Sequence, residues 1–368
     1  MGDRKTSILF AGGGTGGHLF PAIAIAEEIR RMRPLTAIHF AGTKDKIEAR
    51  VVPQLGYVFE PIWISGLRRK LTLENLLFPI KLMASIVQSY NLMNRIRPSA
   101  VVGTGGYVSG PVVYAASLMR IPTILQEQNS YPGITTRMLS QRATEVHLTF
   151  ESSARFLKRK DNIRVTGNPV RSSVGTISRA DAVRSFGLDA SKKAVLVFGG
   201  SLGATSLNTA LLNGYERIVE TGTQILWQTG AKDFASIREK ANHPSVKVMQ
   251  FIENMDHAYA ACDLAVCRAG ATTLAELTLA GVPSILVPYP FAAADHQTEN
   301  AKVMTEHGAS LLLADKDVNS RLVDEVMALL KDASRRNAMA RSTKALGKPD
   351  AAAKIAQAIL AIADAHHG

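Results

Sequence analysis

A glycine-rich stretch near the start of the sequence has the composition of a ligand-binding loop. Glycines occupy positions 12, 13, 14, 16 and 17, between an apolar run at 7–11 and a segment at 22–30 with helical spacing. Backbone N–H groups in such a loop, at the N-terminus of a helix, suit a phosphate or a sugar hydroxyl that approaches the main chain closely. A tight strand-to-helix turn is the alternative, although a turn needs fewer glycines.

Two common nucleotide sites are disfavoured at this loop. Its glycines match the dinucleotide pattern G-x-G-x-x-G. That pattern needs an acidic residue at the end of the next strand to bind a ribose, and the strand expected at 37–41 ends without one, because Asp45 lies beyond it. An ATP-binding loop needs a lysine where the sequence has His18. The sequence therefore disfavours NAD and ATP at this position.

Polar residues gather again in the second half of the chain. A strand–turn–helix unit expected within residues 268–290 places the Ala271 amide at a helix N-terminus and Glu276 one and a half turns further on. A carboxylate there can accept hydrogen bonds from a ribose diol, and Gln297 could reach a sugar hydroxyl. Taken singly, Glu276 is better interpreted as a solvated helix residue, and Asp295 with His296 as a helix cap.

Alternating strands and helices must position these groups. Short apolar runs separated by helix-like or glycine-rich stretches predict a parallel sheet covered by helices, and the plan restarts at 193–203. The sequence therefore predicts an α/β fold of two Rossmann-like domains in tandem, joined near 168–177. Further glycine loops lie at 103–107 and 199–203. We expect the first of these to line one anionic site together with the loop at 12–17, and the second to begin the other domain.

Charge is divided unevenly between the two halves. Residues 1–172 carry 23 Lys and Arg against 11 Asp and Glu, whereas residues 173–368 carry 20 of each, so the first half holds the whole net charge of +12. A basic half predicts a polyanionic partner for that half alone: nucleic acid, anionic lipid or a phosphorylated substrate. Two cysteines and no N-terminal signal segment indicate a reduced cytosolic protein, and no apolar run is long enough to span a bilayer.

Seven ordered motifs resemble one glycosyltransferase family. They lie at residues 12–29, 103–111, 126–133, 167–171, 199–204, 268–277 and 295–301. Together they make the chain similar to the MurG family of GT-B glycosyltransferases (glycosyltransferase family 28), which transfer GlcNAc from UDP-GlcNAc to lipid I in bacterial peptidoglycan synthesis. The resemblance implies two Rossmann-like domains with parallel sheets facing a central cleft. It assigns an acceptor and membrane-associating domain to 1–172 and a donor domain to 173–350, with a C-terminal helix at 351–368 that could pack back on the first domain.

The resemblance also implies roles for individual residues. Glu276 is expected to hold the ribose and the Ile252 backbone the uracil. Ser201 and Arg171 are expected on the donor diphosphate, with Gln297 and Asn129 on the GlcNAc hydroxyls. The full donor set is Thr15, Gly16, Gly17, Asn129, Arg171, Ser201, Ile252, Ala271, Thr272, Thr273, Leu274, Ala275, Glu276 and Gln297. The residues implied for the acceptor diphosphate are Gly14, Gly105, Gly106 and Tyr107.

The chemistry that the resemblance implies is an inverting transfer. The muramyl hydroxyl attacks the anomeric carbon opposite the departing UDP, so a base is needed on one face and anion stabilisation on the other. His18 is the first candidate for the base, because a helix N-terminus disfavours a protonated ring, and Glu127 is the second. No tightly bound cofactor or metal is expected, with Mg²⁺ at most stimulatory.

Membrane contact is expected in the basic first half. Apolar and cationic residues alternate there and predict a patch that lies on an anionic surface: Leu76, Leu77, Phe78, Ile80, Arg68, Arg69 and Lys70. An ordinary buried helix after a basic loop is the alternative. The implied partners are UDP-GlcNAc, lipid I and the anionic membrane surface, with cell-wall synthesis proteins as candidates and no nucleic acid. The implied location is peripheral, on the cytoplasmic face of the bacterial inner membrane.

Other functions fit parts of the same pattern, because fold alone does not fix chemistry. A glycolipid synthase differs only in its acceptor. A UDP-GlcNAc 2-epimerase needs no lipid, so the one-sided basic charge counts against it. A non-enzymatic nucleotide-sugar sensor would keep the donor motifs and would have no use for a basic side chain at the reacting sugar.

Overall fold

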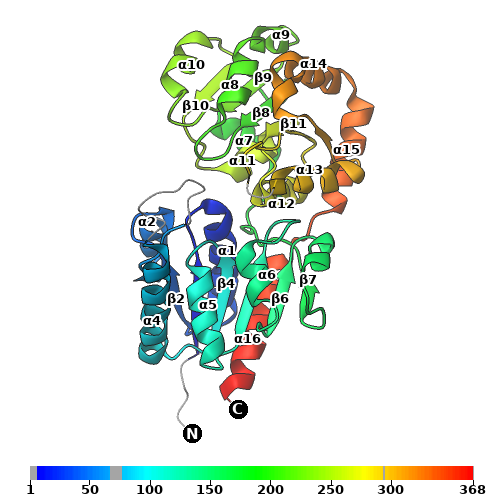
Figure 1. The fold of residues 1–368 in the computed structure, drawn as a ribbon. Helices are drawn as coiled ribbons and strands as arrows, with labels where there is room; N and C mark the ends of the chain where they lie inside the picture. The colour runs from blue at the N-terminus through cyan, green and yellow to red at the C-terminus, as the bar shows by residue number, and fades with distance from the viewer. Residues whose placement is uncertain (1–5, 67–76, 293–294, 368) are drawn as a thin grey trace. The chain divides into compact units, whose positions relative to one another are not determined.

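The chain folds into two compact units, each built on its own parallel sheet (Figure 1). The computed structural model describes residues 6–66, 77–292 and 295–367. Unit 1 comprises residues 1–171 and 349–368, and unit 2 comprises residues 172–348. The expected boundaries, after residues 172 and 350, lie within two residues of these divisions.

Unit 1 contains a seven-stranded sheet in the order β3-β2-β1-β4-β5-β6-β7, with every neighbouring pair parallel. Its elements are β1 (Ser7–Gly12), α1 (Gly16–Met32), β2 (Ala37–Gly42), α2 (Ile47–Gln54), β3 (Val58–Pro61), α4 (Phe78–Ile96), β4 (Ala100–Gly105), α5 (Ser109–Leu118), β5 (Thr123–Glu127), α6 (Ile134–Leu139), β6 (Glu145–Leu148), η1 (Glu151–Phe156), β7 (Ile163–Val165) and the C-terminal α16 (Ala351–His367).

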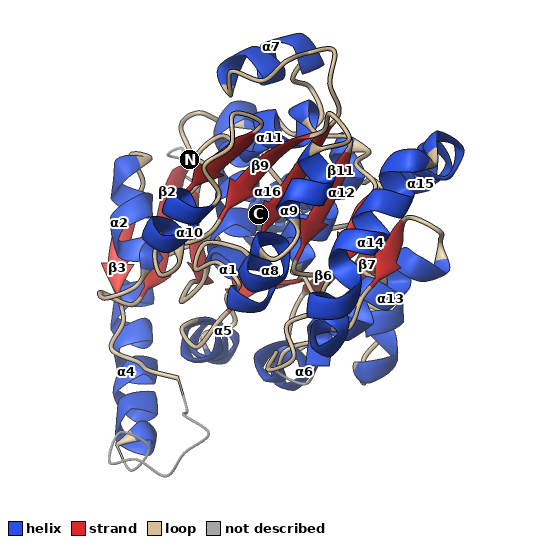
Figure 2. Ribbon diagram, turned by 90° about the horizontal axis from the view of Figure 1, so that it is seen from above, coloured by secondary structure: helices blue, strands red, loops and turns tan. Residues whose placement is uncertain are grey.

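Helices cover both faces of this sheet, which is why its strands read as continuous apolar runs. All six residues of β1 are buried, and successive side chains enter different cores. Ile8 and Phe10 join a cluster with α1 and α16, whereas Leu9 and Ala11 join a cluster with α4 and α5. Figure 2 colours the helices blue and the strands red. The C-terminal helix therefore belongs to the core of unit 1 through Ile355, Ile359 and their neighbours.

Unit 2 repeats the plan with six parallel strands in the order β10-β9-β8-β11-β12-β13. Its elements are α7 (Arg179–Ser185), β8 (Ala194–Phe198), α8 (Thr205–Leu212), α9 (Tyr215–Val219), β9 (Gln224–Gln228), α10 (Phe234–Lys240), β10 (Val246–Met249), α11 (Met255–Ala261), β11 (Leu264–Cys267), α12 (Ala271–Ala280), β12 (Ser284–Leu286), α13 (His296–Glu306), β13 (Ser310–Leu312), η3 (Asp315–Asp317), α14 (Val318–Lys331) and α15 (Ala333–Ala345).

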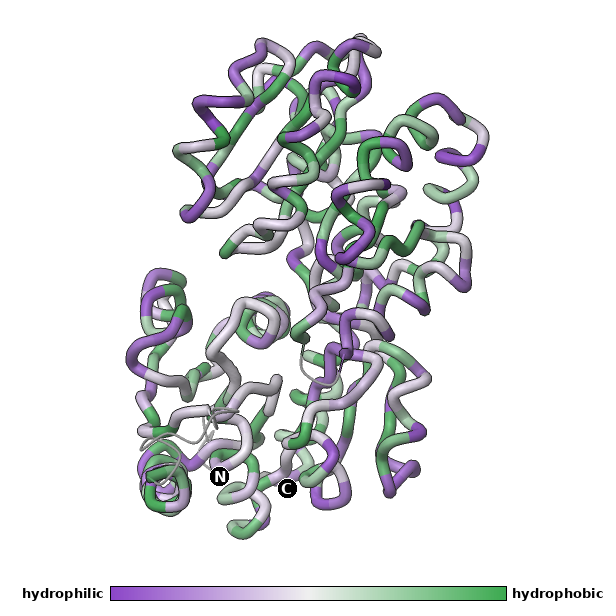
Figure 3. Tube along the Cα trace, turned by 45° about the horizontal axis from the view of Figure 1, so that its top comes forward, coloured by the Kyte–Doolittle hydropathy of each residue, from purple (hydrophilic) through white to green (hydrophobic). Residues whose placement is uncertain are grey.

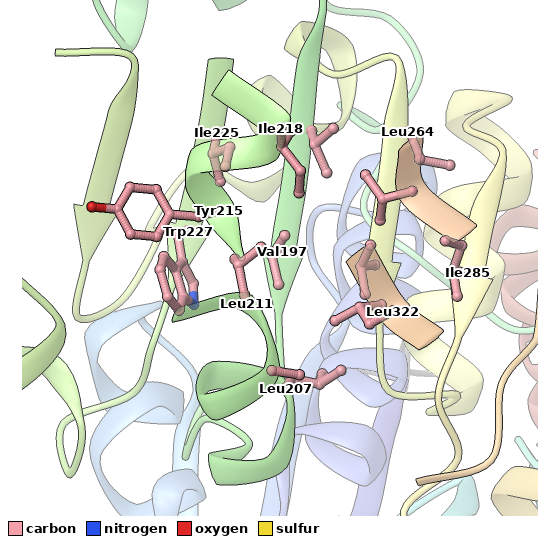
Figure 4. Packing of buried hydrophobic residues seen from close by; sticks show 14 of the residues in the cluster. Val197, Leu207, Leu211, Tyr215, Ile218, Ile225, Trp227, Leu264, Ile285 and Leu322 are labelled. Carbon is pink, nitrogen blue, oxygen red and sulfur yellow. The ribbon is translucent and has the colours of Figure 1, made fainter. Parts of the chain in front are cut away.

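The largest core cluster of unit 2 lies between its sheet and helices α8, α9 and α14 (Figure 4). Trp227 is fully buried there, and its indole N–H donates to Asn208 Oδ1 at 3.0 Å. Asn208 in turn donates to the Thr229 carbonyl at 2.9 Å, so the buried polar atoms satisfy one another. Figure 3 shows hydrophobic (green) and hydrophilic (purple) stretches alternating along the chain in both units.

Both sheets reverse their winding direction at their first strand. In unit 1 the chain leaves β1 toward β2 and leaves β4 toward β5, so a switch point lies between β1 and β4. In unit 2 the corresponding point lies between β8 and β11. Loops at the carboxyl ends of such strand pairs diverge and leave a crevice for a ligand. The fold therefore places a candidate site at each switch point.

Candidate active site

The two glycine-rich loops of unit 1 pack directly against each other at its switch point. Gly12 at the end of β1 is paired with Gly105 at the end of β4. Gly106 has a φ of +82°, and a Cβ at that position would overlap the carbonyl oxygen of Gly13. Only glycine allows this backbone approach. The expected proximity of the loops at 12–17 and 103–107 is therefore present in the structure.

A buried carboxylate lies beneath the first loop. Glu48, on α2, is 1% exposed and accepts hydrogen bonds from the Gly14 N–H at 2.9 Å and from the Thr43 N–H at 3.0 Å. The Thr43 hydroxyl donates to the same carboxylate at 2.8 Å. An acidic residue thus does reach the end of the second strand, contrary to the expectation from residues 37–45. Its oxygens are used by the chain itself, so it is not open to a ribose.

This arrangement decides which amides of the loop can meet a ligand. The Gly14 N–H, which was assigned to the acceptor diphosphate, already donates to Glu48. The N–H groups of Thr15, Gly16 and Gly17, at the start of α1, have no acceptor within the described residues, and no side chain caps the helix. Thr15 and Gly17 are exposed. The anion-binding capacity of the loop therefore lies at positions 15–17.

His18 lies over the junction of the two loops. Its Nδ1 is 3.1 Å from Gln128 Oε1, and its backbone carbonyl accepts a hydrogen bond from the Thr104 hydroxyl at 2.9 Å. A Cβ at Gly105 would lie 2.6 Å from Nδ1, so the missing side chain of Gly105, whose φ is +103°, makes room for the ring. The other ring nitrogen, Nε2, has no hydrogen-bond partner within the part of the chain that the structure describes.

Glu127, the second candidate for the base, is enclosed by donors. The residue is 4% exposed, and its Oε1 accepts from the Asn129 N–H at 3.1 Å and the Asn129 side-chain amide at 3.3 Å. Its Oε2 accepts from the Gly133 N–H at 2.9 Å and the Thr136 hydroxyl at 2.7 Å. This carboxylate ties the loop after β5 to the start of α6. The same bonds use the Asn129 side-chain amide, which was assigned to a GlcNAc hydroxyl.

The loop between β8 and α8 carries the residue expected on the donor diphosphate. Ser201 is exposed at its tip, and the neighbouring Leu202 is 88% exposed. Beneath the tip, Gln228 links two parts of the expected donor site. Its Nε2 donates to the Gly200 carbonyl at 2.9 Å, and its Oε1 accepts from the Ile252 N–H at 2.8 Å. Since the Ile252 N–H is engaged, its carbonyl is the backbone group left for a uracil N–H.

The helix after β11 presents the residue expected on the ribose. Helix α12 begins at Ala271 without a side-chain cap, and Glu276 lies on it with a half-buried carboxylate. The phenol of Tyr259, on α11, donates to Glu276 Oε2 at 2.9 Å. Burial, and then the charge of Glu276, raise the pKa of this phenol well above 10. Tyr259 therefore stays protonated and remains a donor.

Other members of the expected donor set surround this helix start. Thr272 Oγ1 is shielded from solvent and has no partner within the described residues, in the first turn that also contains Thr273, Leu274 and Ala275. Gln297, on α13, accepts from the Tyr289 N–H at 2.9 Å through its Oε1. Arg171 ends the first of the two segments that form unit 1 and is partly exposed. Tyr107 is 58% exposed after the second glycine loop.

The expected membrane patch falls only partly on described residues. Arg68, Arg69, Lys70 and Leu76 lie outside them. The described members are Leu77 and Ile80, which are 47% and 61% exposed, and the half-buried Phe78. Helix α4 extends this surface, because further apolar side chains project outward from it: Met83, Val87 and Tyr90, with Trp63 beside Lys81. We call the following described residues the α4 patch: Trp63, Leu77, Phe78, Ile80, Met83, Val87 and Tyr90.

Helix α4 is unusual in which residues it turns inward. Ser85 and Ser89 are fully buried, and each satisfies its hydroxyl on a carbonyl of the same helix, at 2.7 and 2.6 Å. Large apolar side chains lie on both faces of the helix, because Leu92 and Met93 are buried whereas Ile80, Met83 and Val87 are exposed. This exposed apolar face favours the surface patch over the ordinary buried helix, and the patch stays a prediction. None of the described helices is long and apolar enough to cross a membrane.

Sequence reasoning missed the residues that hold the candidate site residues in place. They are Glu48, Thr104, Gln128, Gln228 and Tyr259. Gln128 and Thr104 stood inside the recognised motifs at 126–133 and 103–111, and the neighbouring Gln126 was a further available signal. Contacts 17 to 86 positions away in the sequence connect Glu48, Thr104, Gln228 and Tyr259 to their partners, and periodicity does not reveal such contacts.

Two doubly wound units, each with its ligand loops at the switch point of its sheet, define the class of GT-B glycosyltransferases. Residues 8–148 match the glycosyltransferase family 28 N-terminal domain, and residues 194–355 match the glycosyltransferase family 28 C-terminal domain. The chain belongs to glycosyltransferase family 28.

Curated relatives are similar over the whole chain. A Salinibacter ruber protein is 42% identical over 366 residues, which cover 99% of each sequence. A Chlorobium luteolum protein is 43% identical over 366 residues, covering 98% of this chain and 100% of its own. Both are named UDP-N-acetylglucosamine--N-acetylmuramyl-(pentapeptide) pyrophosphoryl-undecaprenol N-acetylglucosamine transferase.

Solved structures agree with this assignment. The crystal structure of Acinetobacter baumannii MurG matches with a TM-score of 0.76 and 28% identity, covering 97% of this chain and 99% of its own. UDP-GlcNAc 2-epimerase from Neisseria meningitidis, bound to UDP-GlcNAc, matches with a TM-score of 0.69 at 13% identity, covering 97% of this chain and 100% of its own. The second likeness shows the fold alone.

Proposed function

We propose that the chain transfers GlcNAc from UDP-GlcNAc to the C4 hydroxyl of the MurNAc residue of lipid I, which gives lipid II for peptidoglycan synthesis. Full-length similarity to transferases of that name supports the substrates. The observation that carries the chemistry is the position of His18: its Nε2 has no partner among the described residues, and the ring lies at the junction of two ligand loops.

On the acceptor side, His18 acts as the general base. Nε2 removes the proton of the C4 hydroxyl as its oxygen attacks the anomeric carbon of GlcNAc. The new bond between C4 oxygen and anomeric carbon forms as the bond to UDP breaks on the opposite face, so an α-linked donor gives a β-1,4 product. The unpaired amides of residues 15–17 offer hydrogen bonds to a diphosphate or a sugar oxygen beside the base.

On the donor side, unit 2 binds UDP-GlcNAc at its switch point. Glu276 accepts from the ribose diol, the Ile252 carbonyl accepts from the uracil, and Ser201 with Arg171 contacts the diphosphate. The uncapped start of α12 adds backbone amides whose partial positive charge favours the anionic leaving group. These donors belong to the chain itself, so we propose that any Mg²⁺ only stimulates the reaction.

Glu127 takes a positioning role in this scheme. Four donors engage its two oxygens, so an incoming hydroxyl would have to displace one of them before a proton could move. The carboxylate instead fixes the loop that carries Asn129. This geometry favours His18 over Glu127 as the base.

The enzyme would reach its lipid substrate as a peripheral protein on the cytoplasmic face of the inner membrane. The α4 patch supports this proposal, because it places large apolar side chains in solvent around Lys81 on the basic half of the chain. An anionic membrane surface is the partner with matching chemistry. Proteins of cell-wall synthesis are further candidate partners.

The test is incubation with UDP-GlcNAc and a lipid I analogue, with UDP release and product linkage as readouts. We expect the wild-type protein to form a β-1,4-linked disaccharide and the His18→Ala variant to form almost none. UDP release only with a diacylglycerol acceptor would instead indicate a glycolipid synthase, and formation of UDP-ManNAc would indicate a 2-epimerase. Donor binding without any turnover would indicate a sensor.

A further inference from the structure

The side chain of Gln128 lies between the ring of His18 and three oxygen atoms of the chain. Its Oε1 is 3.1 Å from His18 Nδ1. Its Nε2 donates to the Thr104 carbonyl at 2.7 Å, to the Gln126 carbonyl at 3.2 Å, and to the Gln126 side-chain oxygen. Gln128 is 3% exposed and Gln126 is 1% exposed, so no bulk water competes for these bonds.

These partners fix which way the Gln128 amide points. The Thr104 and Gln126 backbone carbonyls can only accept hydrogen bonds, so the amide nitrogen must face them. A reversed amide would set its oxygen against those carbonyls and leave several buried polar atoms unpaired, at a cost of about 1–3 kcal/mol for each. The amide oxygen must therefore face His18.

An amide oxygen accepts and cannot donate, so the ring atom opposite it has to carry the proton. We propose that Gln128 is a positioning residue that holds neutral His18 in its Nδ1–H form and so keeps the Nε2 lone pair available for the acceptor hydroxyl. The inference rests on the proposed function, because the Nε2 lone pair matters only if His18 acts as the base. In histidines generally, the hydrogen bond made by one ring nitrogen decides which of the two nitrogens carries the proton.

Thr104 completes the support of the ring. Its carbonyl accepts from Gln128 and its hydroxyl donates to the His18 carbonyl at 2.9 Å, so one residue of β4 holds both the histidine backbone and the amide that orients its side chain. A neutral amide also differs from the carboxylate that orients histidine in many hydrolases. It fixes the ring without adding a negative charge where the acceptor diphosphate is expected.

The test is Gln128→Met, which keeps the length of the side chain and removes both polar atoms. Nitrogen-15 NMR of the histidine-labelled full chain reports the protonated ring nitrogen, and the His18→Asn spectrum assigns His18 among the nine histidines. We expect wild-type His18 to show a protonated Nδ1 and a bare Nε2, and the variant to move toward a protonated Nε2. We also expect kcat to fall roughly 10- to 100-fold with little change in the KM for UDP-GlcNAc, as part of the about 10²- to 10⁴-fold contribution of a positioned base.

Gln224→Met is the matched control. Gln224 is also a buried glutamine, and among the described residues its side chain hydrogen-bonds to the backbone of Asp189 in unit 2 and not to a histidine. We expect a similar loss of stability in this control, with the His18 spectrum and kcat unchanged. A protonated Nε2 in the wild-type protein, or an unchanged His18 spectrum in Gln128→Met, overturns the inference. The two parts of the inference can also be separated. If the spectra show the expected protonated nitrogens but His18→Ala keeps normal turnover, Gln128 does orient the His18 ring and His18 is not the base.

Discussion

The phenol of Tyr259 donates a hydrogen bond to Glu276 Oε2 at 2.9 Å, which joins α11 to the helix that carries the expected ribose ligand. Tyr259 is 1% exposed, and its raised pKa keeps the proton on the phenol at any pH at which the protein works. The hydrogen bond from Tyr259 thus fixes the position of Glu276 Oε2. The carboxylate can then meet a ribose diol in one orientation instead of several.

Tyr259→Phe should weaken donor binding without slowing the chemical step. Hydrogen bonds to charged groups contribute about 1.5–3 kcal/mol, so we expect the KM for UDP-GlcNAc to rise roughly 10- to 100-fold with kcat nearly constant. The increase in KM should disappear with a 2′,3′-dideoxyribose donor, because that donor has no ribose hydroxyls to donate to Glu276. Tyr215→Phe is the control, because the Tyr215 hydroxyl donates to a backbone carbonyl, that of Lys240, at 3.3 Å. An equal penalty for both donors would refute a role on the ribose.

Glu127→Gln and His18→Ala should separate the two candidates for the base. Replacing the carboxylate of Glu127 turns one acceptor into a donor that faces the Gly133 N–H or the Asn129 amide. We expect lower thermal stability and a moderate loss of turnover that retains its pH dependence. His18→Ala should lose turnover about 10²- to 10⁴-fold with normal binding of UDP-GlcNAc. The reverse ranking, with donor binding intact in both variants, would assign the base to Glu127.

The sequence was sufficient for the plan of the fold. Parallel strands buried on both faces must be apolar throughout, so β1 and β8 were visible as short hydrophobic runs followed by glycines. Chain order then placed the glycine loops at strand ends, where sheets of this type bind ligands. The contact between Gly13 and Gly106 follows from that topology.

The residues that hold the site in place could not be predicted from the sequence in the same way. Glu48 lies in the first turn of α2, where an acidic residue is ordinary at a helix start, and only the fold shows that it turns back to Gly14. The outward apolar face of α4 was missed beyond Ile80, because periodicity indicates an amphipathic helix without saying which face is buried. Packing against the sheet decides that question.

The α4 patch should bind anionic lipid. Replacing Ile80, Met83 and Val87 together with serine removes exposed apolar area and leaves Ser85 and Ser89 on the buried face intact. We expect the variant to bind weakly to vesicles that contain anionic phospholipid and to keep unchanged activity on a short-chain, water-soluble acceptor. Leu35→Ser is the control, because Leu35 is 81% exposed between α1 and β2. Unchanged vesicle binding by the triple variant would remove the patch from the proposed function.

Glu48→Leu should disturb the first glycine loop. The Gly14 and Thr43 N–H groups would lose a buried acceptor, and each orphaned donor costs about 1–3 kcal/mol of stability. We expect the KM for the lipid acceptor to rise while UDP-GlcNAc binding, measured by calorimetry, stays normal. Glu151→Gln, an exposed acid of the same unit, is the control. A variant with normal stability and normal acceptor KM would show that the carboxylate does not hold the loop.

Unit 1 should lose stability in mild acid because of His147. Burial, and then the charge of Arg164, lower the pKa of this histidine from 6.5 to about 4. Glu145 Oε2 lies 3.2 Å from Nε2, yet neither ring nitrogen has a hydrogen-bond partner among the described residues, so desolvation prevails over the neighbouring carboxylate. The unfolded chain therefore binds a proton near pH 6.5 that the folded chain does not accept until about pH 4.

The sign of the effect follows from that difference. The stabilisation by neutral His147 is complete above pH 6.5 and is lost as the pH falls toward 4, at about 1.4 kcal/mol for each pH unit and about 3 kcal/mol in all. Hydrogen exchange of β6 amides, corrected for the intrinsic pH dependence, should show this slope in the wild-type protein and a flatter one in His147→Phe. His307→Gln, at an exposed histidine, should keep the wild-type slope. Identical slopes in wild type and His147→Phe would show that this side chain is not the source of acid sensitivity.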